Sequence, residues 1–172
     1  MSGHSKWSQI KHKKALTDKK KGQIFSKLSR LITLAAKKGT DPKSNPSLAQ
    51  AIENARSVNM PNENIERAIK KVSDKDQAQL EELSIEALGP GGVALKIKAI
   101  TDNRNRTMAE IKKIMTENSS KLVQPGSLTW MFNQPLTLSD TSAQEQIDKL
   151  FEALDDQDEV EDVSSNLAES TE

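Results

Sequence analysis

The sequence has no cysteine and very few aromatic residues. None of its 172 residues is Cys or Tyr, and aromatic residues make up only 3% of the chain. Without thiols, the chain can form neither a disulfide framework nor a thiolate metal site. With so few aromatic side chains, a buried core must consist mainly of Ile, Leu, Val, Ala and Met. These absences exclude a disulfide-stapled secreted domain and a cysteine-based enzyme.

Long apolar segments are also absent. No run approaches the ~18 apolar residues that a bilayer-spanning helix needs. The first seven residues, MSGHSKW, lack the apolar stretch of a signal peptide. The lack of cysteine fits a reducing compartment. We therefore expect a cytoplasmic protein that makes no membrane contact.

Charge is balanced over the whole chain but unevenly distributed along it. Lys plus Arg and Asp plus Glu both number 25. Residues 1–38 hold ten Lys, one Arg and one Asp, a net charge of +10, whereas residues 135–172 hold twelve acidic residues and one Lys, a net charge of −11. This distribution favours a basic end that faces a polyanion and a separate acidic end.

The first half of the chain predicts a basic arm at residues 1–22 followed by a helical domain at residues 23–73. The arm has no sustained apolar face, so we expect it to be mobile or laid along a partner. Apolar residues then recur at helical spacing in three segments. Asn45 is the predicted N-cap of the second helix, with Pro46 at its first position, and the third begins at Pro61. Three apolar faces can share one core.

From residue 80 the apolar period changes from helical spacing to strict alternation. Two strands, around residues 83–87 and 93–99, are predicted on either side of a Gly-rich hairpin turn at residues 89–92. A third strand is predicted at residues 128–132, where Leu, Trp and Phe alternate, and a fourth at residues 160–165.

Two helices are expected between these strands. Thr107 with Glu110, and Ser142 with Glu145, resemble capping boxes that would open them. The layout is then ββαβαβ, a sheet covered by helices on one face. The sequence therefore predicts an α+β protein, with the helical domain followed by an α+β sandwich at residues 80–166 and a tail at 167–172.

The basic arm is the main candidate for a binding site. Its lysine density predicts phosphate neutralisation that is salt-dependent and largely independent of nucleic-acid sequence, against the alternative of a solvated lysine tail. Trp7 could stack on a base or pack on the helical domain. His4 and His12 lack a clustered third ligand, so we expect phosphate contact rather than zinc binding. The candidate residues of the arm are His4, Lys6, Trp7, Lys11, His12, Lys13, Lys14, Lys19, Lys20 and Lys21.

Two arginines near the predicted helix start form a second candidate. Arg104 and Arg106 would reinforce the attraction of a helix N-terminus for anions. The alternative is a structural pairing with Asp102 or Glu110. The Gly-rich segment at residues 89–92 lacks the Lys-Ser/Thr of a phosphate loop, so a hairpin turn is expected. No set of His or carboxylates converges in the sequence, and we expect no catalytic residue, metal or cofactor.

Four stretches together resemble the YebC/PmpR family. They are residues 3–7 with 10–13; residues 59–61 with 65–69; residues 89–94; and residues 101–107, which lead to 125–127 and 130–132. Members commonly carry a further α/β domain inserted after the segment that ends here at residue 132. Residues 136–166 resemble the segment that returns from that insertion. The third domain is therefore expected to be absent after residue 133.

The resemblance implies a fold and a class of function. The fold is a helical domain beside ferredoxin-like α/β domains. Bacterial members are described as DNA-binding transcriptional regulators, and related proteins act in translation, as mitochondrial activators or as ribosome-associated factors that ease stalling at proline runs. We expect a non-enzymatic nucleic-acid-binding regulator, with ribosomal or other structured RNA as the favoured partner and double-stranded DNA as the alternative. A protein-interaction module and a hydrolase are weaker alternatives.

Overall fold

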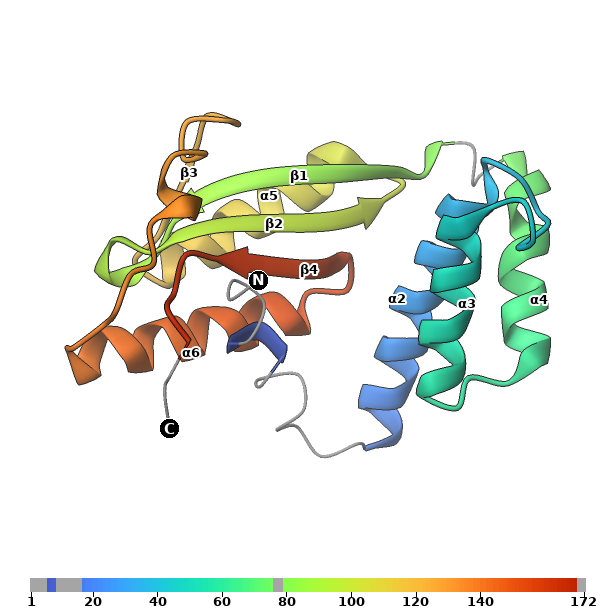
Figure 1. The fold of residues 1–172 in the computed structure, drawn as a ribbon, viewed down its shortest axis with the longest axis horizontal. Coiled ribbons are helices and arrows are strands. Elements are labelled where there is room, and N and C mark those ends of the chain that lie inside the picture. The colour runs from blue at the N-terminus through green and yellow to red at the C-terminus, as the bar shows by residue number, and fades with distance from the viewer. Residues whose placement is uncertain (1–5, 9–16, 76–78, 170–172) are drawn as a thin grey trace. The chain divides into compact units, whose positions relative to one another are not determined.

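Helices occupy the first half of the chain, and a sheet with two covering helices occupies the second half (Figure 1). The computed structural model describes residues 6–8, 17–75 and 79–169. The chain divides into two units. The helical unit comprises Leu16–Glu82 and Ile100–Arg104, and the α+β unit comprises Met1–Ala15, Leu83–Ala99 and Asn105–Glu172.

Three helices form the helical unit, as the apolar spacing predicted. They are α2 (Asp18–Ala36), α3 (Pro46–Ser57) and α4 (Asn62–Lys70), followed by the 3-10 turn η2 (Lys71–Ser73). Figure 1 shows the three helices side by side, and each contributes one apolar face to a common core. The buried residues of that core are Ile32, Ala36, Leu48, Ala51, Ile52, Ala55, Met60, Ile65 and Ala68.

Asn45 holds the junction between α2 and α3. Its side-chain oxygen accepts a hydrogen bond from the Leu48 backbone N–H at 3.2 Å, which confirms the predicted N-cap. Its amide nitrogen donates to the backbone carbonyls of Ala35 and Gly39, each at 2.8 Å. One buried side chain therefore satisfies both the start of α3 and the end of α2.

Helix α2 begins further toward the N-terminus than the apolar pattern predicted. Thr17 is its N-cap and accepts from the Lys20 backbone N–H at 3.2 Å, and Asp18 lies in its first turn. The lysines at residues 19–21, which we predicted to belong to a non-helical arm at residues 1–22, are therefore helical. The prediction failed because it followed the apolar stripe and overlooked the polar capping signal.

The α+β unit is built on a four-stranded antiparallel sheet. Its elements in chain order are β1 (Glu81–Leu88), the turn η4 (Pro90–Gly92), β2 (Ala94–Thr101), α5 (Arg104–Glu117), β3 (Lys121–Val123), η5 (Met131–Asn133), α6 (Thr141–Asp156) and β4 (Val160–Ser165). The strand order is β3-β1-β2-β4, with β3 antiparallel to β1 and β4 antiparallel to β2. The predicted ββαβαβ layout and the fourth strand are confirmed.

The sheet has one covered face and one open face. Helices α5 and α6 pack on the covered face, and α5 is seen behind β1 and β2 in Figure 1. The core there includes Leu83, Ile85, Leu95, Ile97, Ile111, Met115, Ile147, Leu150, Phe151, Leu154 and Val163. Because strand side chains alternate between faces, the open face carries the polar residues Glu82, Ser84, Glu86, Lys96, Lys98, Lys121, Asp162 and Ser164, and the apolar residues Leu88, Ala94, Ile100 and Val123.

The third strand lies at Lys121–Val123, so its prediction at residues 128–132 was wrong. Gly126, at φ +86°, helps turn the chain after β3. One carboxylate oxygen of Glu86 accepts hydrogen bonds from the backbone N–H groups of Gly126 at 2.9 Å and Leu128 at 3.2 Å. This carboxylate holds the segment over the open face as a loop and keeps it from extending a strand.

Both predicted capping boxes were also wrong. Helix α5 begins at Arg104, which places Thr107 inside the helix, where its hydroxyl hydrogen-bonds the Glu159 carboxylate. The N-cap of α6 is Asp140, whose carboxylate accepts from the Ser142 backbone N–H at 3.0 Å. The cap of α6 therefore lies two residues before the predicted one.

Candidate nucleic-acid interface

The first described residues of the chain are anchored to α6. Residues 6–8 form a helical turn. Trp7 is 2% exposed and lies in the core of the α+β unit, where its ring meets that of Phe151 edge-on at 6.1 Å. The Lys6 ammonium forms a 2.8 Å salt bridge with Asp148. Both predicted roles for Trp7, stacking on a base and packing on the helical domain, are therefore wrong. Trp7 packs the turn at residues 6–8 against α6.

The first turns of α2 concentrate positive charge. Lys19 and Lys21 are exposed, and the half-buried Lys20 donates from its ammonium to the Gln23 side-chain oxygen at 3.2 Å. Asp18 is the acidic residue of the first turn. The N-terminal end of a helix already carries a partial positive charge, so lysines there oppose helix stability. The same placement strengthens the attraction of this helix end for phosphate.

The charge separation seen along the sequence persists in the described parts of the chain. Residues 17–75, which include the three helices, hold 13 basic and six acidic residues, a net charge of +7. Residues 79–169, which include the sheet and its helices, hold eight basic and 17 acidic residues, a net charge of −9. The helical unit is therefore the part of the described chain best suited to approach a polyanion.

The two candidate arginines both pair with carboxylates. Arg104 lies 3.7 Å from Glu81, and both side chains are well exposed, so the pair contributes at most about 1 kcal/mol. Arg106 pairs with Glu159, whose side chain is 10% exposed and also bonds Thr107. For Arg106 the geometry favours the structural interpretation. Arg104 remains accessible for contact with an anion.

Glu159 belongs to a hydrogen-bonded network that the sequence did not indicate. The Gln157 side-chain oxygen accepts from the backbone N–H groups of Glu159 at 2.7 Å and Val160 at 2.8 Å. Its amide nitrogen donates to Glu110 at 2.8 Å. The network ties α5 to the start of β4. No local pattern could reveal it, because Gln157 and Glu110 lie 47 residues apart in the chain.

The remaining candidates, His4, Lys11, His12, Lys13 and Lys14, lie outside the described residues. In the part of the chain that the structure describes, no three His, Cys, Asp or Glu side chains cluster as metal ligands would. No helix among residues 6–8, 17–75 and 79–169 has both the length and the apolar character to cross a bilayer.

Comparison with known proteins identifies similar sequences and a similar structure. Residues 5–75 match the TACO1/YebC protein N-terminal domain, and residues 80–135 match the TACO1/YebC second and third domain. A "Probable transcriptional regulatory protein" of Chloroherpeton thalassium is 48% identical over 90% of this chain and 62% of its own length. A similarly named protein of Prosthecochloris aestuarii is 54% identical over 78% of this chain and 54% of its own length. Another, of Chlorobium phaeobacteroides, is 47% identical over 98% of this chain and 68% of its own length.

The structural comparison extends the similarity over the whole fold. The crystal structure of a conserved hypothetical protein from Aquifex aeolicus superimposes with a TM-score of 0.84 at 29% identity, covering 98% of both chains. By contrast, the chain spans only 62% and 54% of the length of the Chloroherpeton and Prosthecochloris proteins.

Proposed function

The chain belongs to the TACO1/YebC family, and from this membership we propose that it is a non-enzymatic, nucleic-acid-binding regulator of gene expression. The observation that carries the proposal is the net charge of +7 over residues 17–75, which include the three helices, in a chain with no net charge. Relatives named as probable transcriptional regulatory proteins support the same class of function.

The lysines that we propose for binding belong to the basic arm and to the first turns of α2. Lys11, Lys13 and Lys14 lie only a few residues before the α2 lysines Lys19 and Lys21 in the chain. Lysine is a compact charge without the planar fork that reads a base edge. Contacts of this kind neutralise phosphates and release counterions, so affinity would fall with salt and depend little on sequence.

Within this class, we infer that structured RNA of the translating ribosome is the main partner, in the cytoplasm. A sequence-specific DNA reader presents several base-contacting side chains on one ordered helix. On α3 the exposed Gln50 and Asn54 hydrogen-bond each other at 3.0 Å, and on α4 Arg67 is paired with Glu63 at 3.0 Å. Exposed carboxylates on α4 would also repel the phosphates that flank a groove.

Transcriptional regulation through double-stranded DNA is the second candidate. The names of the relatives favour it, and a lysine surface binds duplex DNA as readily as ribosomal RNA. The two candidates differ in what they predict for a cell lysate. A ribosomal factor sediments with ribosomal particles, whereas a promoter-specific regulator binds one sequence tightly at physiological salt.

The burial of Trp7 decides how the surface should be tested. Deleting the arm would remove a core side chain of the α+β unit, so charge reversal is the cleaner perturbation. Reversing Lys19 and Lys21 to Glu should weaken binding to unrelated nucleic acids and lower the slope of log affinity against log salt by about two. Reversing Lys112 and Lys149, exposed on α5 and α6, gives a control with the same net charge change.

Sucrose-gradient sedimentation of a nuclease-treated lysate tests whether the protein acts on ribosomes or on promoter DNA. We expect co-migration with ribosomal particles, lost in the variant with Lys19 and Lys21 reversed and kept in the control. Absence from every ribosomal fraction, together with selective nanomolar binding to one promoter, would establish the transcriptional alternative. Unchanged affinity of the reversed variant for every probe would contradict the proposed surface.

A further inference from the structure

The α+β unit displays a large aromatic side chain to solvent. Trp130 is 61% exposed, whereas Trp7 is 2% exposed. Among the described residues, Trp130 and Val58 are the large apolar side chains that stay exposed. A tryptophan ring offers the largest apolar surface of any side chain. In a chain with so few aromatic residues, this exposed ring is the candidate contact for a ligand that stacks on it.

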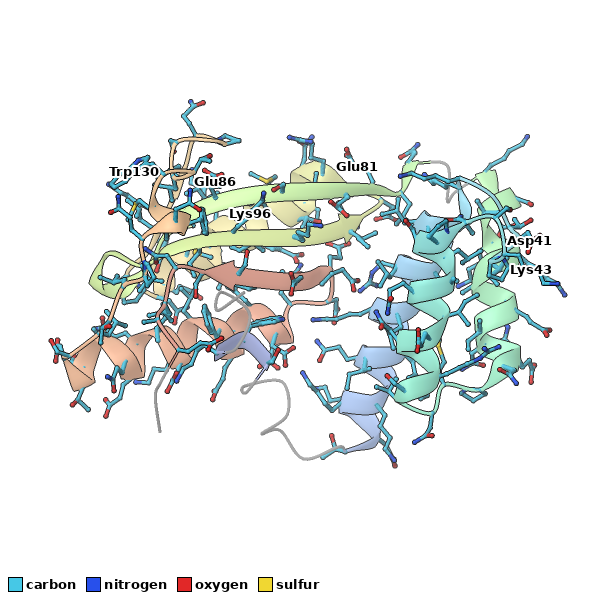
Figure 2. The ribbon with its side chains drawn as sticks, in the orientation of Figure 1. Asp41, Lys43, Glu81, Glu86, Lys96 and Trp130 are labelled. Atoms are coloured by element: carbon cyan, nitrogen blue, oxygen red, sulfur yellow. The ribbon has the colours of Figure 1, made fainter. Side chains whose placement is uncertain are left out.

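The loop that carries Trp130 is held by hydrogen bonds along its length. Glu86 on the open face accepts from the backbone of Gly126 and Leu128. The Thr129 hydroxyl donates to the Gly126 carbonyl at 3.0 Å, and the Met131 backbone N–H donates to the Leu128 carbonyl at 2.9 Å. The loop therefore positions Trp130 at the margin of the open face. In Figure 2, Glu86, Lys96 and Trp130 lie toward the same end of the sheet.

Two lysines of the open face carry positive charge that no acidic side chain of the described residues pairs with. Lys96 and Lys121 are exposed and form no ion pair with any other described residue. Of the carboxylates on the same face, Glu86 holds the loop, and Glu82 and Asp162 each have an interaction partner. These two lysines therefore offer contacts to an anion although residues 79–169 carry a net charge of −9.

We propose that Trp130 and the open face of the sheet bind single-stranded RNA. Trp130 stacks on an unpaired base, and Lys96 and Lys121 contact phosphates on either side of β1. Strands β3 and β2 are two strand spacings apart, roughly 10 Å, a distance that adjoining nucleotides can bridge. The inference rests on the proposed function in taking RNA as the partner, but it uses a surface separate from the basic arm.

Single-stranded RNA fits this surface better than a duplex does. The bases of a duplex are already stacked on one another and cannot lie on a protein ring without unpairing. Unpaired bases stack on exposed aromatic side chains with little regard to sequence, while lysines follow the phosphates.

The test compares a fluorescein-labelled single-stranded RNA octamer with an RNA duplex, using the full chain and its variants. Trp130→Ala should weaken binding of the octamer by about 5-fold to 100-fold and leave duplex binding unchanged. The octamer should also quench the tryptophan fluorescence of the wild-type protein, and this quenching should be lost in Trp130→Phe, which keeps a ring for stacking. Val58→Ala serves as a control that removes another exposed apolar side chain.

The lysines are tested in parallel. Reversing Lys96 and Lys121 to Glu should weaken octamer binding, whereas the control with Lys112 and Lys149 reversed should keep wild-type affinity. Thermal unfolding followed by circular dichroism checks that each variant is folded. If Trp130→Ala and the reversed open-face variant both bind the octamer as the wild type does, the inference is wrong. The inference is also wrong if the sole effect of Trp130→Ala is to convert a dimer into a monomer, as measured by sedimentation.

The two proposals fail in different ways. Charge reversal at Lys19 and Lys21 should weaken octamer and duplex alike, whereas Trp130→Ala should weaken the octamer alone. If reversal of Lys19 and Lys21 leaves binding unchanged while Trp130→Ala still weakens octamer binding, the proposed arm surface is contradicted and the open face is supported. If Trp130→Ala leaves octamer binding unchanged while reversal of Lys19 and Lys21 weakens binding, the open face is contradicted and the arm surface is supported.

Discussion

Substitution of Trp7 by Ala should destabilise the α+β unit by about 3–5 kcal/mol, the usual range for a buried Trp or Phe cut back to Ala. Trp7 is 2% exposed, so nearly its whole side chain is removed from water. An aromatic residue of this kind buries roughly 200 Å², which corresponds to about 5 kcal/mol at ~25 cal/mol per Å². Ala keeps a small part of that burial.

The contact with Phe151 adds a directional component. Its edge-on geometry, with an interplanar angle of 85°, is the arrangement in which aromatic pairs contribute about 0.5–1.5 kcal/mol beyond area burial. The neighbouring Lys6–Asp148 salt bridge has side chains 31% and 42% exposed, so its loss should cost less than about 1 kcal/mol. Tryptophan burial should therefore hold the N-terminal segment far more strongly than the ion pair does.

Urea unfolding followed by far-ultraviolet circular dichroism measures this difference. Trp7→Phe should lose less stability than Trp7→Ala because a phenyl ring still meets Phe151, and Lys6→Ala should lose least. If Trp7→Ala unfolds within about 0.5 kcal/mol of the wild type and also loses affinity for single-stranded RNA, Trp7 lies in solvent. In that event residues 6–8 are not anchored to α6.

Four further predictions concern the fold. Gly91 lies at φ +70°, and a Cβ there would stand 2.6 Å from the Leu138 side chain, so Gly91→Ala should lower stability by about 1–3 kcal/mol in thermal unfolding. Gly22 lies in α2, and a Cβ there would have no neighbouring atom within 4 Å, so Gly22→Ala should raise stability by about 0.5–1 kcal/mol. Asn45→Ala should cost about 2–3 kcal/mol in urea unfolding, because it removes a helix cap and leaves two backbone carbonyls without their donor. A chain ending after Asn133 lacks α6 and β4 and should lose cooperative unfolding of the α+β unit; a melt as sharp as that of the full chain would mean that the C-terminal segment is not part of the sheet domain.

The elements that the sequence predicted well are those with local physical causes. Asn45 and Pro46 mark the start of α3 because a cap acts within three residues and proline presets the first helical φ. The alternation of apolar residues in β1 and β2 reflects burial of one sheet face, which a period of two records directly. Strand β4 was likewise predicted at its observed residues, 160–165.

Less of the candidate site could be predicted from local sequence patterns. The lysine density of residues 1–38 is a property of composition, and it needs no structure to be seen. The pairing of Arg106 with Glu159 spans 53 residues, and no spacing rule connects them. Trp130 was assigned to a strand because it alternates with Leu128 and Phe132, and its exposure on a loop could not be inferred from that alternation.

What the sequence alone determined is therefore the order and type of most elements and the separation of a basic end from an acidic end. Only the tertiary structure decided that Trp7 is a core residue, that Glu86 holds the loop after β3, and that Trp130 remains exposed. The physical reason is the range of the interactions involved. Caps and apolar periods act within one or two turns of the chain, whereas burial depends on partners that only the completed fold brings together.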